Sequence, residues 1–171
     1  MSDLSHTAYQ VPATTSTEIR GIRLRPGVQI QQAQLRSWLL ERKPTDLFKS
    51  DQLNEFCTIK PNVKSALDCL ANDNQSVLCV AKELGVSLRT LERLVKAGTG
   101  QSPYYWFSLA RARKAGRSFA GIDNLSEAAF LAGFSDQSHM NREIKKWFRL
   151  TPKSLKNDSE MLGLLFDSGY G

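Results

Sequence analysis

The chain has 171 residues, of which 41% are hydrophobic and 23% are charged, and its net charge is +6. This length suits one domain or two small ones, and the composition excludes a chain that is disordered throughout. No run of about 18 apolar residues is present, so the sequence predicts no membrane-spanning helix. The N-terminus lacks the basic start and apolar stretch of a secretory signal, so we expect a cytoplasmic protein.

The three cysteines, Cys57, Cys69 and Cys79, are odd in number and widely spaced, which argues against a disulfide framework and favours a reducing compartment. A zinc site needs about four ligands held close together, and neither histidine has such partners nearby in the sequence. We therefore expect the cysteines to be buried as small hydrophobic residues. Since a phosphate loop and a dinucleotide motif are also missing, the sequence predicts no metal, no cofactor and no enzyme.

Positive charge is concentrated in the middle of the chain. Residues 61–156 hold 15 Lys/Arg and 8 Asp/Glu, a net charge of +7, whereas residues 1–60 carry +2 and residues 157–171 carry −3. A solvated basic surface would explain this excess, and a polyanionic partner is the sharper interpretation.

Residues 1–60 are expected to form a short mixed segment that begins with a weakly ordered leader over residues 1–20. The predicted elements are, in order, a strand within Glu18–Arg25, a Pro26-Gly27 turn, a helix over Val28–Glu41, a loop at Pro44, a short helix marked by Leu47, Leu53 and Phe56, and a domain boundary at Pro61.

From Pro61 onward the apolar spacing is helical throughout. Capping residues, some followed by proline at the first helical position, mark several helix starts. The predicted helices contain Val63–Leu70, Leu78–Leu84, Ser87 to about Lys96 with Gly98 and Gly100 ending it, Pro103 to about Phe119, Leu125–Ala132, and Ser135 or Asp136 to about Phe148.

This helical pattern occurs twice. Gly85 and Gly133 are 48 residues apart, and Ser102-Pro103 and Thr151-Pro152 are 49 apart. In each copy a short helix, a glycine turn, a polar cap and a longer helix follow one another, as in a helix-turn-helix unit whose second helix can lie in a DNA major groove. The sequence therefore predicts an all-α fold in which a linker helix from Pro103 joins two helix-turn-helix subdomains.

The outward face of each second helix is basic and polar on a helical wheel. Arginine can bind guanine through two hydrogen bonds, whereas lysine mostly meets phosphates. A solvated surface helix is the alternative for either helix taken alone. The candidate DNA-binding residues are Arg89, Glu92, Arg93 and Lys96 in the first helix, opposite Leu88, Leu91, Leu94 and Val95, and Ser138, His139, Arg142, Lys145 and Lys146 in the second, opposite Met140, Ile144, Trp147 and Phe148.

The linker helix is itself basic, with Arg111, Arg113, Lys114 and Arg117. These side chains either meet DNA phosphates or pair with acidic side chains inside the domain, and the sequence leaves both alternatives open.

The segments "VAKELGVSLRTLERLVKAGTGQSP" and "LSEAAFLAGFSDQSHMNREIKKWFRLTP" resemble the two helix-turn-helix modules of the AraC/XylS family of bacterial transcription regulators. The resemblance covers about residues 61–156. It implies binding of double-stranded DNA through adjacent major-groove segments, usually with activation of transcription through RNA polymerase. By position it makes Arg89, Glu92 and Arg93 base-facing in the first module. In the second module it gives this role to Gln137, Ser138, His139, Asn141 and Arg142.

The chain departs from the family pattern mostly at packing positions. The family usually has an aromatic residue at Val95, a small residue at Glu143, glycine at Arg149 and tyrosine at Leu155.

The remaining segments leave alternatives open. "GIRLRPGVQIQQ" resembles the end of the sensor region of some members, and residues 1–60 are too few for an effector-binding barrel, so a small-molecule effector is not expected. The acidic tail, residues 157–171, is either a short helix packed back on the domain or a mobile or partner-binding segment. The leading hypothesis is a transcription regulator, and the alternatives are a truncated protein that modulates a full-length family member and a DNA repair enzyme with a reactive cysteine.

Overall fold

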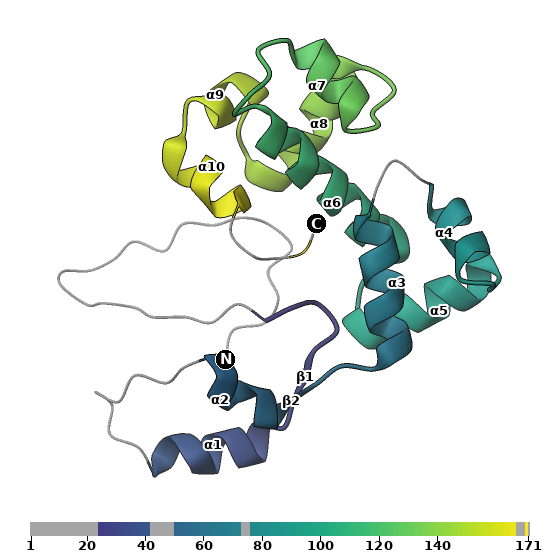
Figure 1. The fold of residues 1–171 in the computed structure, drawn as a ribbon, viewed down its shortest axis with the longest axis vertical. Coiled ribbons are helices and arrows are strands. Elements are labelled where there is room, and N and C mark those ends of the chain that lie inside the picture. The colour runs from purple at the N-terminus through teal and green to yellow at the C-terminus, as the bar shows by residue number, and fades with distance from the viewer. Residues whose placement is uncertain (1–23, 42–49, 73–75, 167–169, 171) are drawn as a thin grey trace.

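A computed structural model describes residues 24–41, 50–72, 76–166 and 170, which are largely helical (Figure 1). Its all-α class with a short mixed N-terminal segment confirms the predicted fold. The elements are β1 (Gln29–Ile30), α1 (Gln32–Leu40), α2 (Ser50–Leu53), the 3₁₀ helix η1 (Asn54–Phe56), β2 (Cys57–Thr58), α3 (Pro61–Ala71), α4 (Val77–Glu83), α5 (Leu88–Thr99), α6 (Pro103–Ser118), α7 (Leu125–Leu131), α8 (Gln137–Phe148), α9 (Pro152–Lys156) and α10 (Ser159–Phe166).

Several of the elements expected in the N-terminal segment lie at residues that the structure does not describe. The leader over residues 1–20, the loop at Pro44 and Leu47 lie outside the described residues, as does most of the strand predicted over Glu18–Arg25. Within the part of the chain that the structure describes, no helix is both long and apolar enough to cross a membrane.

The first module packs α3, α4 and α5 against the start of the long helix α6 (Figure 1). Its core is a single cluster that includes Val63, Leu91, Val95 and Trp106, each of which is no more than 4% exposed. The indole N–H of Trp106 donates a 2.8 Å hydrogen bond to the Thr99 hydroxyl, which ties α6 to the end of α5. The hydrophobic effect and this bond together fix α5 on the core.

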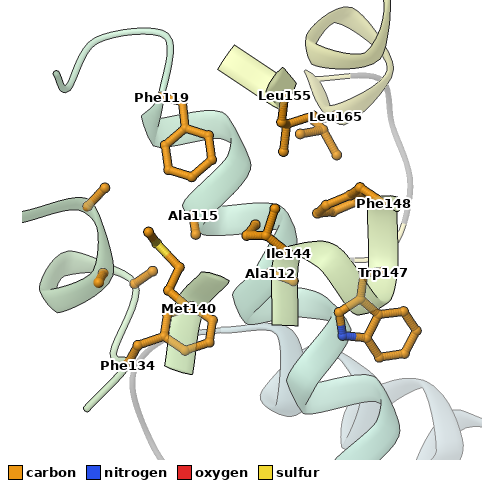
Figure 2. Close-up of a cluster of buried hydrophobic side chains, with 13 residues drawn as sticks. Ala112, Ala115, Phe119, Phe134, Met140, Ile144, Trp147, Phe148, Leu155 and Leu165 are labelled. Atoms are coloured by element: carbon orange, nitrogen blue, oxygen red, sulfur yellow. The ribbon is translucent and has the colours of Figure 1, made fainter. Parts of the chain in front are cut away.

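The second module repeats this arrangement, with α6 taking the place of α3. The core of α6, α7, α8, α9 and α10 is drawn in Figure 2, where Met140 and Ile144 of α8 point toward Ala112 and Ala115 of α6. Small alanines on α6 allow α8 to approach closely, because a larger side chain at these positions would meet the facing helix. Thus α6 contributes to both cores and joins the modules.

The sequence prediction of a helix over Val28–Glu41 is wrong at its start. Residues Gln29–Ile30 form a strand that pairs antiparallel with Cys57–Thr58, and the helix begins only at Gln32. The amide of Gln31 donates a 2.9 Å hydrogen bond to the carbonyl of Phe56. Helical periodicity could not reveal this strand, because its partner lies far along the chain.

The predicted helix starts are confirmed where a polar side chain precedes them. The hydroxyls of Ser87, Ser102 and Thr151 each accept a hydrogen bond from a backbone amide three residues ahead. Such a bond satisfies one of the amides that the first turn of a helix leaves without a partner. Of the two residues considered for α8, Asp136 is the cap: its carboxylate accepts a 2.7 Å bond from the His139 amide.

The prediction that Gly98 helps to end the helix that starts at Ser87 is wrong. This helix, α5, continues through Gly98 to Thr99 and is capped at Gly100. A Cβ atom at position 98 would lie 2.7 Å from Cγ2 of Val63. Gly98 is therefore required for the close approach of α3, and Gly100, with φ of +76°, supplies the left-handed turn.

Candidate nucleic-acid interface

The helix α5 presents its polar face to solvent. The tight turn before it depends on Gly85, whose φ is +66°, and on the bond from the Val86 amide to the Ala81 carbonyl. Leu91 and Val95 are fully buried on one side of the helix and set its rotation. Leu88 departs from the expected inner face, since it is 39% exposed at the first position of α5.

The four candidate residues of α5, Arg89, Glu92, Arg93 and Lys96, are all exposed. With Thr90 they line one shallow surface hollow. Within the described ranges, none of the three basic side chains takes part in a salt bridge, so their charges are available to an external group. A polyanion such as the DNA backbone is the chemistry that suits this face.

The helix α8 is built in the same way. Gly133, with φ of +77°, makes the turn, and Met140 and Ile144 are fully buried. The pKa of Asp136 is lowered, first by the hydrogen bond from the His139 amide and then by that from the Ser135 hydroxyl, so the cap is a carboxylate at neutral pH. A negative charge there also suits the positive end of the helix dipole.

The seven candidates on α8 divide into two groups. Ser138, Arg142, Lys145 and Lys146 are exposed, whereas Gln137, His139 and Asn141 are half-buried. The Ser126 hydroxyl donates a 3.0 Å hydrogen bond to Gln137, and the His139 ring lies 3.2 Å from the Ser135 hydroxyl and edge-on to Phe134. The structure thus ties Gln137 to the start of α7 and His139 to the turn before α8, whereas the four exposed side chains make neither contact.

Lys146 is exposed but has contacts of its own. Its ammonium group lies 3.5 Å from the Glu143 carboxylate and 5.0 Å from the centre of the Trp147 ring. Arg142 and Lys145 make no salt bridge to any described residue. These two side chains are therefore the more available cations of α8.

A polar cluster that sequence reasoning missed anchors α8 to α6. The carboxylate of Glu143 accepts hydrogen bonds from the Ser108 hydroxyl and, at 3.0 Å, from the Trp147 indole. Burial raises the pKa of Glu143. The hydrogen bonds from Ser108 and Trp147 and the charge of Lys146 together lower this pKa by more than burial raises it, so the net pKa lies below its usual value. The only sequence signal was that Glu143 is large and acidic at a position where the AraC/XylS family, which the sequence resembles, usually has a small residue.

The basic residues of the linker helix are not spread over its solvent side. The Arg111 guanidinium lies 4.3 Å from the centre of the Phe134 ring, and the Arg113 side chain is buried and donates a 3.0 Å hydrogen bond to the Leu165 carbonyl. These two arginines therefore lie against the domain, as the second alternative expected, but their contacts described above are with an aromatic ring and a backbone carbonyl rather than with acids. Burial lowers the pKa of Arg111, although it stays charged at neutral pH.

The prediction of buried cysteines is wrong. Cys57 and Cys69 are half-buried, and Cys79 is exposed. Cys79 lies near the start of α4, where the neighbouring Val80 and Ala81 occupy the buried side instead. Among the described residues, no three His, Cys, Asp or Glu side chains come close enough together to hold a metal ion.

Residues 80–158 match a family described as a helix-turn-helix domain. The transcriptional activator RhaS of Pectobacterium atrosepticum is 32% identical over 81 residues, which are 47% of this chain and 29% of that protein. The chain thus spans less than a third of the length of this relative.

Two solved structures show the same fold. One is a transcriptional regulator with an AraC-type DNA-binding domain from Chromobacterium violaceum, with 24% identity and a TM-score of 0.52 over 57% of this chain and 90% of that one. The other is the xylose-binding transcription activator xylR, with 16% identity and a TM-score of 0.52 over 84% of this chain and 44% of that one.

Proposed function

We propose that residues 80–158 form an AraC-type double helix-turn-helix domain and that, through it, the chain binds double-stranded DNA sequence-specifically and regulates transcription. One observation carries the proposal. A shift of 49 residues places Arg93 on Arg142 and Lys96 on Lys145, and all four side chains are exposed. Two modules that present arginine and lysine at the same positions of the same helix suit two successive segments of one major groove.

The proposed division of roles follows the chemistry of the side chains. Arg93 and Arg142 read base edges, because a guanidinium matches the two acceptors of guanine. The resemblance assigns base reading also to Arg89, Glu92, Gln137, Ser138, His139 and Asn141. Lys96, Lys145 and Lys146 meet phosphates, which fixes the position of the protein on the duplex.

Activation is a further part of the proposal. The relative from Pectobacterium atrosepticum is named as an activator, and we extend this role, with RNA polymerase as the partner, to the present chain. Residues 1–60 are proposed to be a remnant of a sensor region that binds no effector by itself. The protein would then act in the cytoplasm, at the nucleoid.

The experiment is a binding titration of the full chain against duplexes that it selects from a random pool. With about five phosphate contacts, the logarithm of the binding constant should fall with the logarithm of salt concentration with a slope of about −4.5. A flat salt dependence, or a pool that gains no common sequence, would overturn the proposal.

Three variants test the division of roles. Arg93→Ala and Arg142→Ala should each weaken binding to the selected duplex by about 1–3 kcal/mol and relax its sequence preference at separate positions. Lys145→Ala should weaken binding to selected and random duplexes alike. Arg36→Ala, which removes an exposed arginine of α1, is the matched control and should change neither. Equal losses on both duplexes for all three variants would refute the assignment of Arg93 and Arg142 to bases.

A further inference from the structure

Two described residues near the end of the sequence, Leu165 and Tyr170, pack on different modules. Leu165 of α10 is 2% exposed in the core of the second module, whereas Tyr170 is 9% exposed in the core of the first. Five residues of extended chain span at most about 18 Å, so the two anchors are joined by a short tether.

The first anchor, Leu165, packs against Gly116 of α6, where the absence of a side chain leaves room for it. A Cβ atom on Gly116 of α6 would lie 2.5 Å from Cδ1 of Leu165, so a larger residue at position 116 would force the Leu165 side chain to move from its present position. The carbonyl of Leu165 also accepts the hydrogen bond from Arg113 of α6. A buried arginine needs such a partner. The position of α10 on α6 is therefore defined both by the fit of Leu165 against Gly116 and by the hydrogen bond from Arg113.

The second anchor, Tyr170, packs on the opposite module. Its ring meets that of Trp106 at a centroid distance of 5.1 Å and an interplanar angle of 70°. Leu67 and Asp68 of α3 lie beside it. Burial, and next the charge of Asp68, raise the pKa of the Tyr170 hydroxyl, so the side chain is neutral at physiological pH.

Tyr170 is also the end of a row of aromatic rings that crosses the module boundary. Trp147 of α8 lies 4.8 Å from Tyr105, Tyr105 lies 5.0 Å from Trp106, and Trp106 contacts Tyr170. All three pairs have edge-to-face geometry, which aromatic rings favour. Removing the Tyr170 ring should therefore also disturb the contact between Trp147 of α8 and Tyr105 of the linker helix α6.

We infer that the C-terminal tail is a strap and that Tyr170 is a positioning residue, which fixes the orientation of α5 relative to α8. The inference rests on the proposed function, because a fixed orientation sets which spacing of two DNA segments the modules can bind together. Without the strap the modules are joined through α6, where the half-buried Tyr105 and Leu109 pack on both cores.

The strap matters for binding because linked modules gain affinity only when both can engage at once. This gain is about 10²–10⁴-fold and falls as the tether becomes looser. A tail released from the first module should therefore reduce affinity for a duplex with both half-sites, leave affinity for a single half-site unchanged, and broaden the range of tolerated spacings.

The test uses the full chain with Tyr170→Ala, which removes the anchor. Phe166→Ala is the matched control, because it removes an aromatic side chain of the same tail that is 59% exposed. Tyr170→Phe keeps the ring, and since the hydroxyl has no hydrogen-bond partner among the described residues, it should behave as the original chain. A chain ending at Phe166 is a second way to remove the anchor.

The first measurement needs no DNA. Residual dipolar couplings of the backbone amides of α5 and α8 should fit one alignment tensor in the original chain, Tyr170→Phe and Phe166→Ala. They should need two tensors in Tyr170→Ala and in the chain ending at Phe166. A single tensor in all five proteins would overturn the inference whatever the chain binds.

The second measurement uses duplexes selected by the original chain, with half-site spacing unchanged, increased by one base pair, or with one half-site scrambled. Tyr170→Ala should lose about tenfold on the first duplex, lose less on the second, and match the original chain on the third. Equal losses on all three would show a general folding defect and refute the positioning role. If the original chain selects no sequence, the proposed function fails, and the dipolar couplings still decide whether the strap exists.

Discussion

The two helix-turn-helix modules share one register but hold their second helices in different ways. Position 98 of the first module is glycine, and position 147 of the second, 49 residues later, is a buried tryptophan. In the first module α3 lies so close to α5 that only glycine fits, whereas in the second a large ring fills the space against α6. The same outward face can therefore be supported by close backbone approach or by aromatic packing.

The modules also differ where each second helix ends. Gly100 after α5 and Arg149 after α8 both adopt the left-handed conformation, with φ of +76° and +60°. Glycine reaches this region without a steric penalty, but arginine does not. Thus the second module accepts backbone strain at a point where the first has none.

The largest expected effect breaks the packing of the first module alone. Gly98→Ala places a methyl group 2.7 Å from Cγ2 and 2.8 Å from Cγ1 of Val63. Because Val63 is buried and β-branched, it cannot turn away freely, and overpacking should lower the free energy of unfolding by about 1–3 kcal/mol. Chemical denaturation followed by circular dichroism measures the loss.

The matched control for this change is Gly121→Ala. A Cβ atom at Gly121 meets no described atom within 4 Å, so the substitution should be close to neutral. If Gly98→Ala were as stable as the control, α3 would not approach α5 as closely as the structure shows.

Sequence signals located the helices of both modules because those signals are local. Ser87, Ser102 and Thr151 are capping residues whose hydroxyls accept the predicted backbone bonds, and Gly85 and Gly133 make the predicted turns. Non-local requirements were invisible. The strand Gln29–Ile30 depends on a distant partner, and Gly98 is needed by α3 rather than by the end of its own helix.

The candidate interface shows the same division. The family resemblance makes Asn141 of α8 base-facing, but it does not reveal that the neighbours of Asn141 leave it half-buried. Likewise a basic linker helix predicted phosphate contacts as readily as internal ones, and only the positions of Phe134 and Leu165 place Arg111 and Arg113 inside. Charge and periodicity predict on which side of a helix a residue lies, whereas the exposure of that residue depends on the elements packed around it.

A smaller effect should make the two modules more alike. Arg149→Gly removes the cost of the left-handed conformation, about 1–2 kcal/mol for a residue with a side chain, and adds the larger chain entropy of glycine in the unfolded state. The net result should be a gain in stability of about 0.5–1 kcal/mol. Thermal unfolding measures it, and Lys153→Gly, at an exposed helical position of α9, is the control that should lose stability. A loss from Arg149→Gly would mean that its side chain contributes more than its backbone costs.

The smallest effect concerns Glu143, whose counterpart 49 residues earlier is the apolar Leu94. Glu143→Gln keeps an oxygen that can accept from Ser108 and Trp147 but loses the charge that attracts Lys146. Bonds to a charged acceptor are stronger than neutral ones, and the partly exposed ion pair adds little, so stability at neutral pH should fall by about 0.5 kcal/mol.

The pH dependence separates this electrostatic role of Glu143 from simple packing. The pKa of Glu143 is lowered in the folded state, so the carboxylate stabilises the fold above the pKa that it has in the unfolded chain. That contribution disappears as the pH falls through the folded pKa, below the usual value of 4.5. The difference in unfolding free energy between the original chain and Glu143→Gln should therefore shrink on acidification, and Leu94→Met, which carries no titrating group, should show a difference that does not change with pH. A Glu143→Gln difference that stayed constant from neutral pH to about pH 3 would show that shape rather than charge holds α8 on the linker helix.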